Sequence, residues 1–252
     1  MKRSFLLMIL LYSTFSILCS AQDGLIPEFK LEPNDLELHR LARPGTPFDK
    51  VGHKFAILGD ESGAFEVWAY PLKLFRNLQI SFFIGTSTQA ISGCDIVRYI
   101  SVTPEATTLT YTYQSFTVKA TYITPVDEPG AMILLKVDSS EPLVINFSFS
   151  PVLQPMWPAG IGGQYAYWDN NNHYYLMSEP TRQNHGVIGS PLAEKVSYTP
   201  AHMLSDTPNE FKINITEPDS VQGKYIPVIM AGGKGDRKEV LATYKRLCAN
   251  PQ

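Results

Sequence analysis

Charge is scarce in this sequence, and basic residues are not in excess. Only 18% of the 252 residues are charged, with 21 Lys and Arg against 24 Asp and Glu. A mildly acidic chain lacks the cationic field that holds phosphate backbones, so we expect no nucleic-acid partner. Apolar residues make up 44% and aromatic residues 12%, which excludes a disordered chain and is sufficient for a folded core.

Cysteine is also nearly absent, with Cys19, Cys94 and Cys248 alone in the chain. Cys19 falls in the expected leader, and the other two leave a long-range disulfide and two free buried thiols equally open. Two cysteines make no metal framework, and the five histidines show no pair at the i, i+4 spacing of a zinc-binding helix. We therefore expect no metal and no cofactor.

The local patterns of common catalytic centres are missing as well. The chain has no Gly-x-Ser-x-Gly nucleophile motif. Asp60-Glu61 and Asp127-Glu128 are adjacent carboxylates, which point to opposite faces of a strand and cannot converge as an acid–base pair. The glycine-rich stretch 232–235 lacks the spacing of a phosphate loop and predicts a hinge. No catalytic residue is predicted within the chain.

The first 21 residues have the three parts of a secretory signal. Lys2-Arg3 are basic, Phe5–Leu18 is apolar, and Cys19–Ala21 places small residues before Gln22. The apolar run is too short to span a bilayer, and no basic cluster follows it. We expect residues 1–21 to be removed, a secreted or periplasmic protein, and no stable membrane insertion afterwards.

The remainder is dominated by the two-residue period of β-strands. Residues 22–50 are polar and proline-rich and predict an extended lead-in segment, whereas 51–234 consists of short strand-like runs ended by turn residues. Thr108–Tyr113 and the alternating run 116–122 predict a hairpin that turns at Gln114-Ser115. Met132–Val137 and Leu143–Phe149 predict a second pair, covered on both faces. The predicted fold is mainly β: a large antiparallel β-sandwich of the supersandwich type.

One helix is expected at the end, over residues 235–252. Asp236 with Glu239 forms a capping-box pattern. The apolar residues then fall on one helical face; they are Val240, Leu241, Tyr244, Leu247 and Cys248. Such a helix either packs back on the sandwich or leads as a linker into a further domain.

The segment Met156–Glu179 is the most unusual part of the composition, because Trp, Tyr, Gly and Asn gather in it. Flat aromatic rings stack on the apolar faces of sugars, and carboxamide and carboxylate groups pair with their hydroxyls. The predicted carbohydrate-binding residues are Trp157, Gln164, Tyr167, Trp168 and Asp169. An equally open interpretation makes the two tryptophans core residues and Asp169–Asn172 a hairpin turn.

Four strings in the chain are similar to a known family. They are Glu66–Lys73, Met156–Gln164 with Trp168-Asp169, Ile188–Pro191 and Ala242–Leu247. The chain from about Val51 onward resembles the N-terminal β-sandwich of bacterial glycoside hydrolases of the glycogen-debranching, amylo-α-1,6-glucosidase-like type. In that family the catalytic domain is a toroid of six helical hairpins, and the resemblance implies that the catalytic carboxylates lie there and not in this chain.

The resemblance gives the first functional hypothesis. It implies the non-catalytic N-terminal sandwich of an exported glycoside hydrolase that acts on α-glucan-type carbohydrate. The sandwich would support a C-terminal helical catalytic domain absent from this chain, which is apparently truncated before it, and would line the sugar cleft. The expected ligand is an oligo- or polysaccharide. The alternatives are a free-standing secreted carbohydrate-binding module and a structural or adhesion sandwich.

Overall fold

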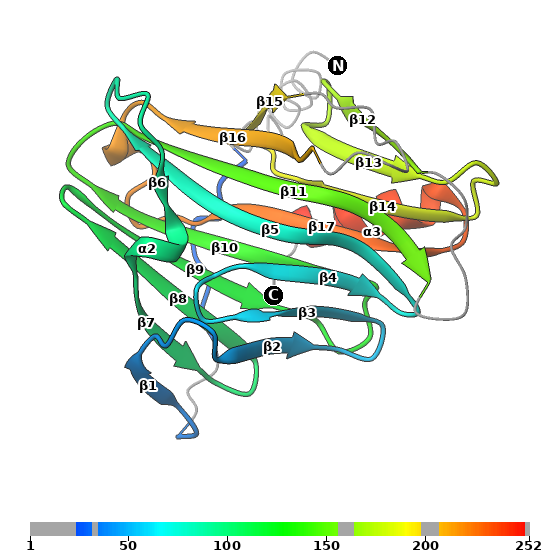
Figure 1. Ribbon diagram of the computed structural model, residues 1–252, viewed down its shortest axis with the longest axis horizontal. Coiled ribbons are helices and arrows are strands. Elements are labelled where there is room, and N and C mark those ends of the chain that lie inside the picture. Colours follow the sequence, from blue (N-terminus) through cyan, green and yellow to red (C-terminus); the bar gives the residue numbers. More distant parts are fainter. Residues whose placement is uncertain (1–23, 32–34, 156–163, 198–206, 250–252) are drawn as a thin grey trace, which may run out of the picture.

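Two antiparallel sheets pack face to face (Figure 1). The structure is a computed structural model that describes residues 24–31, 35–155, 164–197 and 207–249. The larger sheet has nine strands, in the order β1 (Leu38–Leu41), β7 (Val97–Val102), β8 (Ala106–Tyr113), β9 (Phe116–Ile123), β10 (Gly130–Ser139), β17 (Ile226–Lys234), β14 (Asn184–Gly189), β13 (Tyr174–Ser178) and β12 (Tyr165–Asp169).

The smaller sheet has eight strands. Their order is β15 (Ala193–Ser197), β16 (Asn209–Ile215), β11 (Leu143–Pro155), β5 (Leu72–Ile84), β4 (Phe65–Ala69), β3 (Phe55–Asp60) and β2 (Pro47–Val51), with β6 (Ile91–Ser92) paired to β5. A one-turn helix α2 (Gly93–Ile96) leads into β7, and a 3₁₀ turn η1 (Pro218–Ser220) precedes β17. The predicted fold class, a large antiparallel β-sandwich with one C-terminal helix, is confirmed.

The main core lies between the two sheets and follows from alternation along the strands. In β4 every second residue is buried, and β16 shows the same pattern over seven residues. Aromatic rings fill the space between the sheets: Phe147 stacks on Phe211 with centroids 4.9 Å apart, and Phe75 meets Phe149 edge to face at 5.4 Å. Each such ring stabilises the fold by about 1.5–3 kcal/mol through burial.

The hairpin predicted around Gln114-Ser115 is confirmed. β8 pairs with β9 so that Tyr113 faces Phe116 and Thr112 faces Thr117. Gln114 has φ +39°, the left-handed conformation that two-residue hairpin turns require.

The second predicted hairpin is wrong. β10 pairs with β9 and β17 in the larger sheet, whereas β11 pairs with β5 and β16 in the smaller one. The connection at 140–142 therefore crosses from one sheet to the other, and Ser140 N donates to Ser115 O on the way. Apolar runs identify buried strands, but they do not specify which strand lies beside which.

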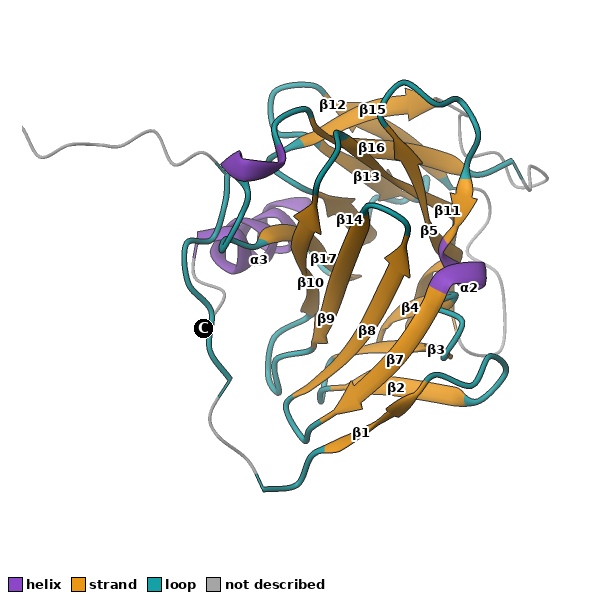
Figure 2. Ribbon diagram, turned by 90° about the vertical axis from the view of Figure 1, so that its left-hand side faces the viewer, coloured by secondary structure: helices purple, strands orange, loops and turns teal. Residues whose placement is uncertain are grey.

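The segment 22–50 differs from the expected lead-in, because it contains β1 and most of β2. β1 pairs with β7 in the larger sheet, and β2 pairs with β3 in the smaller one. The chain between them therefore joins the two sheets along one side, at the bottom of Figure 2. Both strands are short and mostly exposed, so they carry no alternating pattern from which the sequence could reveal them.

A second core lies outside the larger sheet, under helix α3 (Arg237–Ala249). Val240, Tyr244 and Leu247 of the helix pack on the outward residues of the central strands, which include Met132, Leu134, Leu176, Val187 and Ile229. The predicted apolar helix face is confirmed, and Lys238 N donates to the predicted cap Asp236 Oδ1 at 3.0 Å.

Helix α3 approaches the sheet closely because Gly130 has no side chain. A Cβ there would lie 2.7 Å from Leu247 Cδ1 and 2.8 Å from Met230 O. Both distances are too short for real contacts, so only glycine allows this packing.

Candidate functional site

Strand β12 carries three of the predicted sugar-binding residues and separates them. Trp168 points toward the main core, where it meets Tyr175 edge to face at 4.9 Å and lies 6.5 Å from Phe211. Tyr167 points to the opposite face, toward helix α3, with the Arg237 guanidinium 5.3 Å from its ring centroid. The structure does not bring Tyr167 and Trp168 to one surface.

Asp169 closes the turn between β12 and β13. Its Oδ1 accepts from Asn171 N at 2.9 Å and Asn172 N at 3.0 Å, and Oδ2 accepts from Asn172 Nδ2 at 3.1 Å. Partial burial opposes its charge, but these hydrogen bonds outweigh that effect and lower the pKa of Asp169. The turn geometry is the one that the alternative interpretation of the sequence describes.

The other two predicted residues lie in different positions. Gln164 Nε2 donates to Pro151 O at 3.0 Å, and Trp157 lies outside the described residues. A sugar-binding role for Trp157, Gln164, Tyr167, Trp168 or Asp169 stays a prediction.

A shallow depression of about 420 Å³ lies on the outer face of the smaller sheet. It combines two carboxylates and an amide with an apolar floor. Its lining residues are Leu58, Gly59, Asp60, Ala64, Phe65, Glu66 and Asn77. Polar groups beside apolar surface can contact a ligand that has both hydroxyl and C–H groups.

Glu66 is the most ordered group at this depression. Its Oε1 accepts from Trp68 Nε1 at 2.7 Å, and its Oε2 accepts from Lys73 Nζ at 2.6 Å. Lys73 Nζ also lies 4.9 Å from the centroid of the Trp68 ring, a cation–π distance. Alternation along β4 puts Glu66 and Trp68 on the outer face, and cross-strand pairing brings Lys73 beside Trp68. The carboxylate is thereby held in one orientation.

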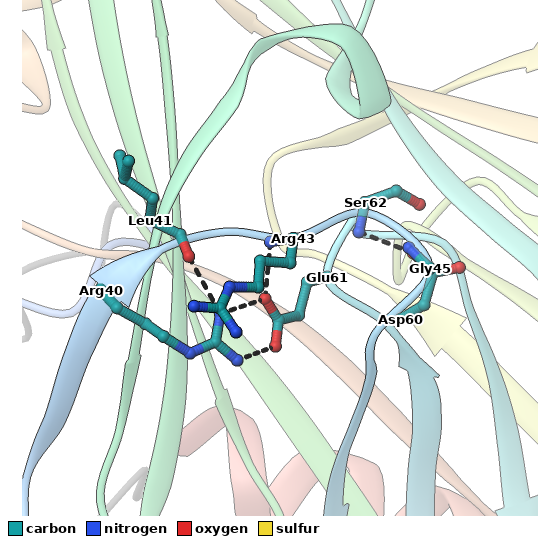
Figure 3. Close-up of polar contacts among 7 residues, drawn as sticks. All are labelled: Arg40, Leu41, Arg43, Gly45, Asp60, Glu61 and Ser62. Carbon is teal, nitrogen blue, oxygen red and sulfur yellow. Dashed lines mark hydrogen bonds and ion pairs between the residues drawn. The ribbon is translucent and has the colours of Figure 1, made fainter.

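Asp60, on the rim of the depression, is fixed by the β3–β4 turn. Its Oδ1 accepts from Ser62 N at 2.7 Å and from Gly45 N at 3.4 Å. The adjacent Glu61 turns away toward Arg40 (Figure 3). These neighbouring carboxylates do not converge, as the sequence predicts.

Glu61 and Arg40 form a buried ion pair that attaches β1 to the β3–β4 turn. Arg40 Nη1 donates to Glu61 Oε2 at 2.7 Å, Arg40 Nη2 donates to Oε1, and Arg43 N donates to Oε2 at 2.7 Å (Figure 3). The hydrogen bond from Arg40 outweighs the effect of burial and lowers the pKa of Glu61. The pair therefore has a structural function.

A second buried carboxylate, Glu179, organises the β13–β14 connection. Its Oε1 accepts from Thr181 Oγ1 at 2.7 Å, Gln183 N at 2.8 Å and Asn184 N at 3.1 Å, and Oε2 accepts from Thr181 N at 2.5 Å. Burial opposes the charge, but the hydrogen bonds prevail and lower the pKa of Glu179 to about 2. The sequence analysis missed this group, because its partners are amides of its own loop and no motif marks them.

His185 is buried beside this loop and is held neutral. Nε2 lies 3.1 Å from Arg182 O, and Nδ1 lies 2.7 Å from Ser178 Oγ. A carbonyl oxygen only accepts, so Nε2 carries the proton and the Ser178 hydroxyl donates to Nδ1. Burial lowers the pKa of His185.

These pKa values predict that the fold weakens in acid. A carboxyl whose pKa is lowered in the folded state stabilises the fold above its unfolded pKa, and Glu179 loses that contribution as the pH falls from 4.5 toward 2. The loss reaches about 3 kcal/mol at most.

His185 acts in the same direction below pH 6.5, because the unfolded chain binds its proton more readily. We expect the urea midpoint to fall steadily below pH 6.5. A midpoint constant from pH 7 to pH 3 would contradict this.

Neither a metal site nor a membrane-spanning helix is evident in the described parts of the chain. There, no three His, Cys, Asp or Glu side chains lie close enough to hold a metal ion. None of the helices in those parts is both long and apolar enough to cross a bilayer. Cys94 and Cys248 are free, partly buried thiols.

Comparison with known proteins supports the fold. The sequence matches no protein-family model and no curated protein. The structure is similar to a bacterial glucoamylase in complex with acarbose, with a TM-score of 0.58 and 10% identity over 86% of this chain. At this identity the similarity shows that the two chains share a β-sandwich fold. The chain spans 36% of the glucoamylase chain.

Two further structures, also of carbohydrate enzymes, match with lower TM-scores. A putative kojibiose phosphorylase from the human microbiome has a TM-score of 0.43 and 11% identity, covering 84% of this chain and 29% of its own. A GH92 inverting mannosidase from Bacteroides thetaiotaomicron has a TM-score of 0.40 and 10% identity, covering 77% and 26%.

Proposed function

We propose that this chain is the non-catalytic β-sandwich of an exported glycoside hydrolase acting on α-glucan-type carbohydrate. The observation that carries the proposal is the similarity to the glucoamylase, whose complex with acarbose places that enzyme among carbohydrate-active proteins. The matched sandwich accounts for 36% of that chain. The rest of such an enzyme would hold the catalytic carboxylates, and the sandwich would support it and contact the sugar.

The carboxylates of the sandwich are consistent with a catalytic centre in another part of the enzyme. Glu61 and Glu179 are buried and accept hydrogen bonds from their own surroundings. Glu66 is held by Trp68 and Lys73. Glu61 and Glu179, whose pKa values are lowered, are poor general acids, because that role needs a raised pKa.

We place the sugar contact in the depression beside Glu66. Asp60 and Glu66 accept hydrogen bonds from sugar hydroxyls, and the Asn77 amide both donates and accepts. Leu58 and Ala64, both partly exposed, provide apolar surface for the C–H groups of a pyranose ring. The same site also serves the second candidate function, a free-standing carbohydrate-binding module.

Binding to soluble α-glucans tests the proposal. We expect the purified chain to bind at least one α-glucan in affinity electrophoresis or calorimetry and to release no sugar from it. Asn77 has φ +52°, so Asn77→Gly removes the amide without straining the backbone, and we expect binding about tenfold weaker.

The matched control is Gln114→Gly. Gln114 is also a polar residue with positive φ, in the distant β8–β9 turn, and we expect its replacement to leave binding unchanged. Glycoside cleavage by the chain alone, or no binding to any carbohydrate, would overturn the proposal. An affinity that Asn77→Gly leaves unchanged would remove the depression as the site.

A further inference from the structure

Two aromatic rings lie exposed and parallel on the outer face of the larger sheet. His39 on β1 and Tyr99 on β7 stack with centroids 5.5 Å apart and an interplanar angle of 13°. Tyr99 is 43% exposed, and His39 is exposed as well. Single exposed aromatics need no explanation, but a stacked pair whose outward ring surfaces stay in contact with water is less common.

The pleat of the sheet places both rings on the outer face. Ile100 is buried in the main core, so its neighbour Tyr99 points outward. In the β1–β7 register His39 lies opposite Ser101, and Leu41 lies opposite Tyr99. Leu41 is exposed too, so it extends the apolar surface by one cross-strand position.

Hydroxyl groups surround the rings on the same face. Tyr99 pairs with Thr110, and Ser101 pairs with Thr108; Leu109, between the two threonines, faces the core. Ser101 Oγ donates to Glu37 Oε1 at 2.5 Å. The apolar platform is therefore bordered by oriented hydroxyls and a carboxylate.

Part of this outer face is already covered, on the side of the sheet away from β1. Helix α3 contacts β10, β14 and β17, and Figure 2 shows that it lies away from β7 and β8. Phe29 packs edge to face on Tyr225 at 6.0 Å, and Ile26 bridges Tyr225. Strands β1, β7 and β8 keep their hydroxyls and rings toward solvent.

We propose that His39, Tyr99, Ser101 and Thr110 form a second carbohydrate-binding surface, which takes a neutral oligo- or polysaccharide chain by ring stacking. Pyranose rings present apolar C–H faces that pack on aromatic rings, and their hydroxyls at the edge meet side-chain hydroxyls and carboxylates. The outward surfaces of the stacked pair, bordered by Ser101 and Glu37, offer both kinds of contact. The inference rests on the carbohydrate role proposed above, but it concerns a different sheet from the depression beside Glu66.

Exposed residues make a clean test, because their replacement does not disturb the core. Affinity is measured by calorimetry for the purified chain against a panel of α-glucans, β-glucans and mannans. We expect Tyr99→Ala to weaken binding to the best ligand about tenfold, and Tyr99→Phe, which keeps the ring, to retain it. His39→Ala should weaken binding as well. Thermal unfolding of all three variants should match the wild-type chain.

Tyr70→Ala is the matched control, because Tyr70 is 40% exposed and lies outside the platform, and it should leave binding unchanged. If the chain binds an α-glucan but Tyr99→Ala does not weaken that binding, the platform is overturned and the proposed function stands. If only a β-glucan or a mannan binds, and Tyr99→Ala abolishes it, the platform stands and the α-glucan assignment fails. Equal losses in Tyr99→Phe and Tyr99→Ala would overturn stacking as the mode of binding.

Discussion

Replacing Glu179 by Ala should lower the free energy of unfolding by about 3–4 kcal/mol. Glu179 is fully buried, and the amides of Thr181, Gln183 and Asn184 donate to its carboxylate. Alanine removes the acceptor of these donors, and each one that water does not reach costs about 1–3 kcal/mol. Thr181 and Gln183 lie in an exposed part of the loop, so water replaces part of the loss. Urea unfolding followed by tryptophan fluorescence measures the change.

Two further variants sharpen this prediction. Glu179→Gln keeps one acceptor oxygen and should lose about half as much; it should also flatten the dependence of stability on pH below 4.5. Glu194 is the control, because its carboxylate is exposed and pairs at the surface with Lys212. Glu194→Ala should cost less than about 1 kcal/mol. Equal effects at Glu179 and Glu194 would show that the buried carboxylate does not organise its loop.

Removing the arginine of the Arg40–Glu61 pair should be the second most damaging change. After Arg40→Ala, Arg43 N still donates to the buried Glu61 carboxylate, but the charge has lost its ion-pair partner (Figure 3). An uncompensated buried charge costs about 3–5 kcal/mol; water reaches the Arg40 side of this pair, so the expected loss is smaller than that. Urea unfolding gives the magnitude, and limited proteolysis around residues 42–46 should show that β1 detaches.

A double-mutant cycle separates the pair from its parts. Glu61→Gln together with Arg40→Ala should cost less than the sum of the single changes, since neither charge is then left alone. Arg246 serves as control: it pairs with Glu128 at the surface, so Arg246→Ala should cost under about 1 kcal/mol. Additive losses in the cycle would contradict a coupled pair.

Much of the fold could be predicted from the sequence, because its signals are local. The alternation through Tyr111 and Val118 gives the β8–β9 hairpin with its register, and Asp236 marks the start of the terminal helix. Strand neighbours across the sandwich were not predictable in this way. β10 and β11 follow one another in the chain yet lie in different sheets: β10 pairs with β9 and the distant β17, whereas β11 pairs with the distant β5 and β16.

The candidate site, too, could be predicted from the sequence only in part. Composition singled out Tyr167 and Trp168 together, but adjacent residues on a strand face opposite ways, and the structure puts one against the core and the other under Arg237. The depression at Glu66 was detectable only in part: the order Glu-Val-Trp implies that Glu66 and Trp68 share a face, whereas Asn77 reaches it through a later strand. The His39–Tyr99 stack depends on β1, which has no sequence signal.

Helix α3 changes how the limits of this unit must be drawn. A boundary between residues 234 and 235 separates the sandwich from its terminal helix by composition, but Val240, Tyr244 and Leu247 complete the second core. Removing the helix would expose the apolar outward residues of four central strands. The truncated molecules would then aggregate through this surface. The helix is the outermost layer of the same folded unit. A truncated chain made for expression should therefore end after the helix.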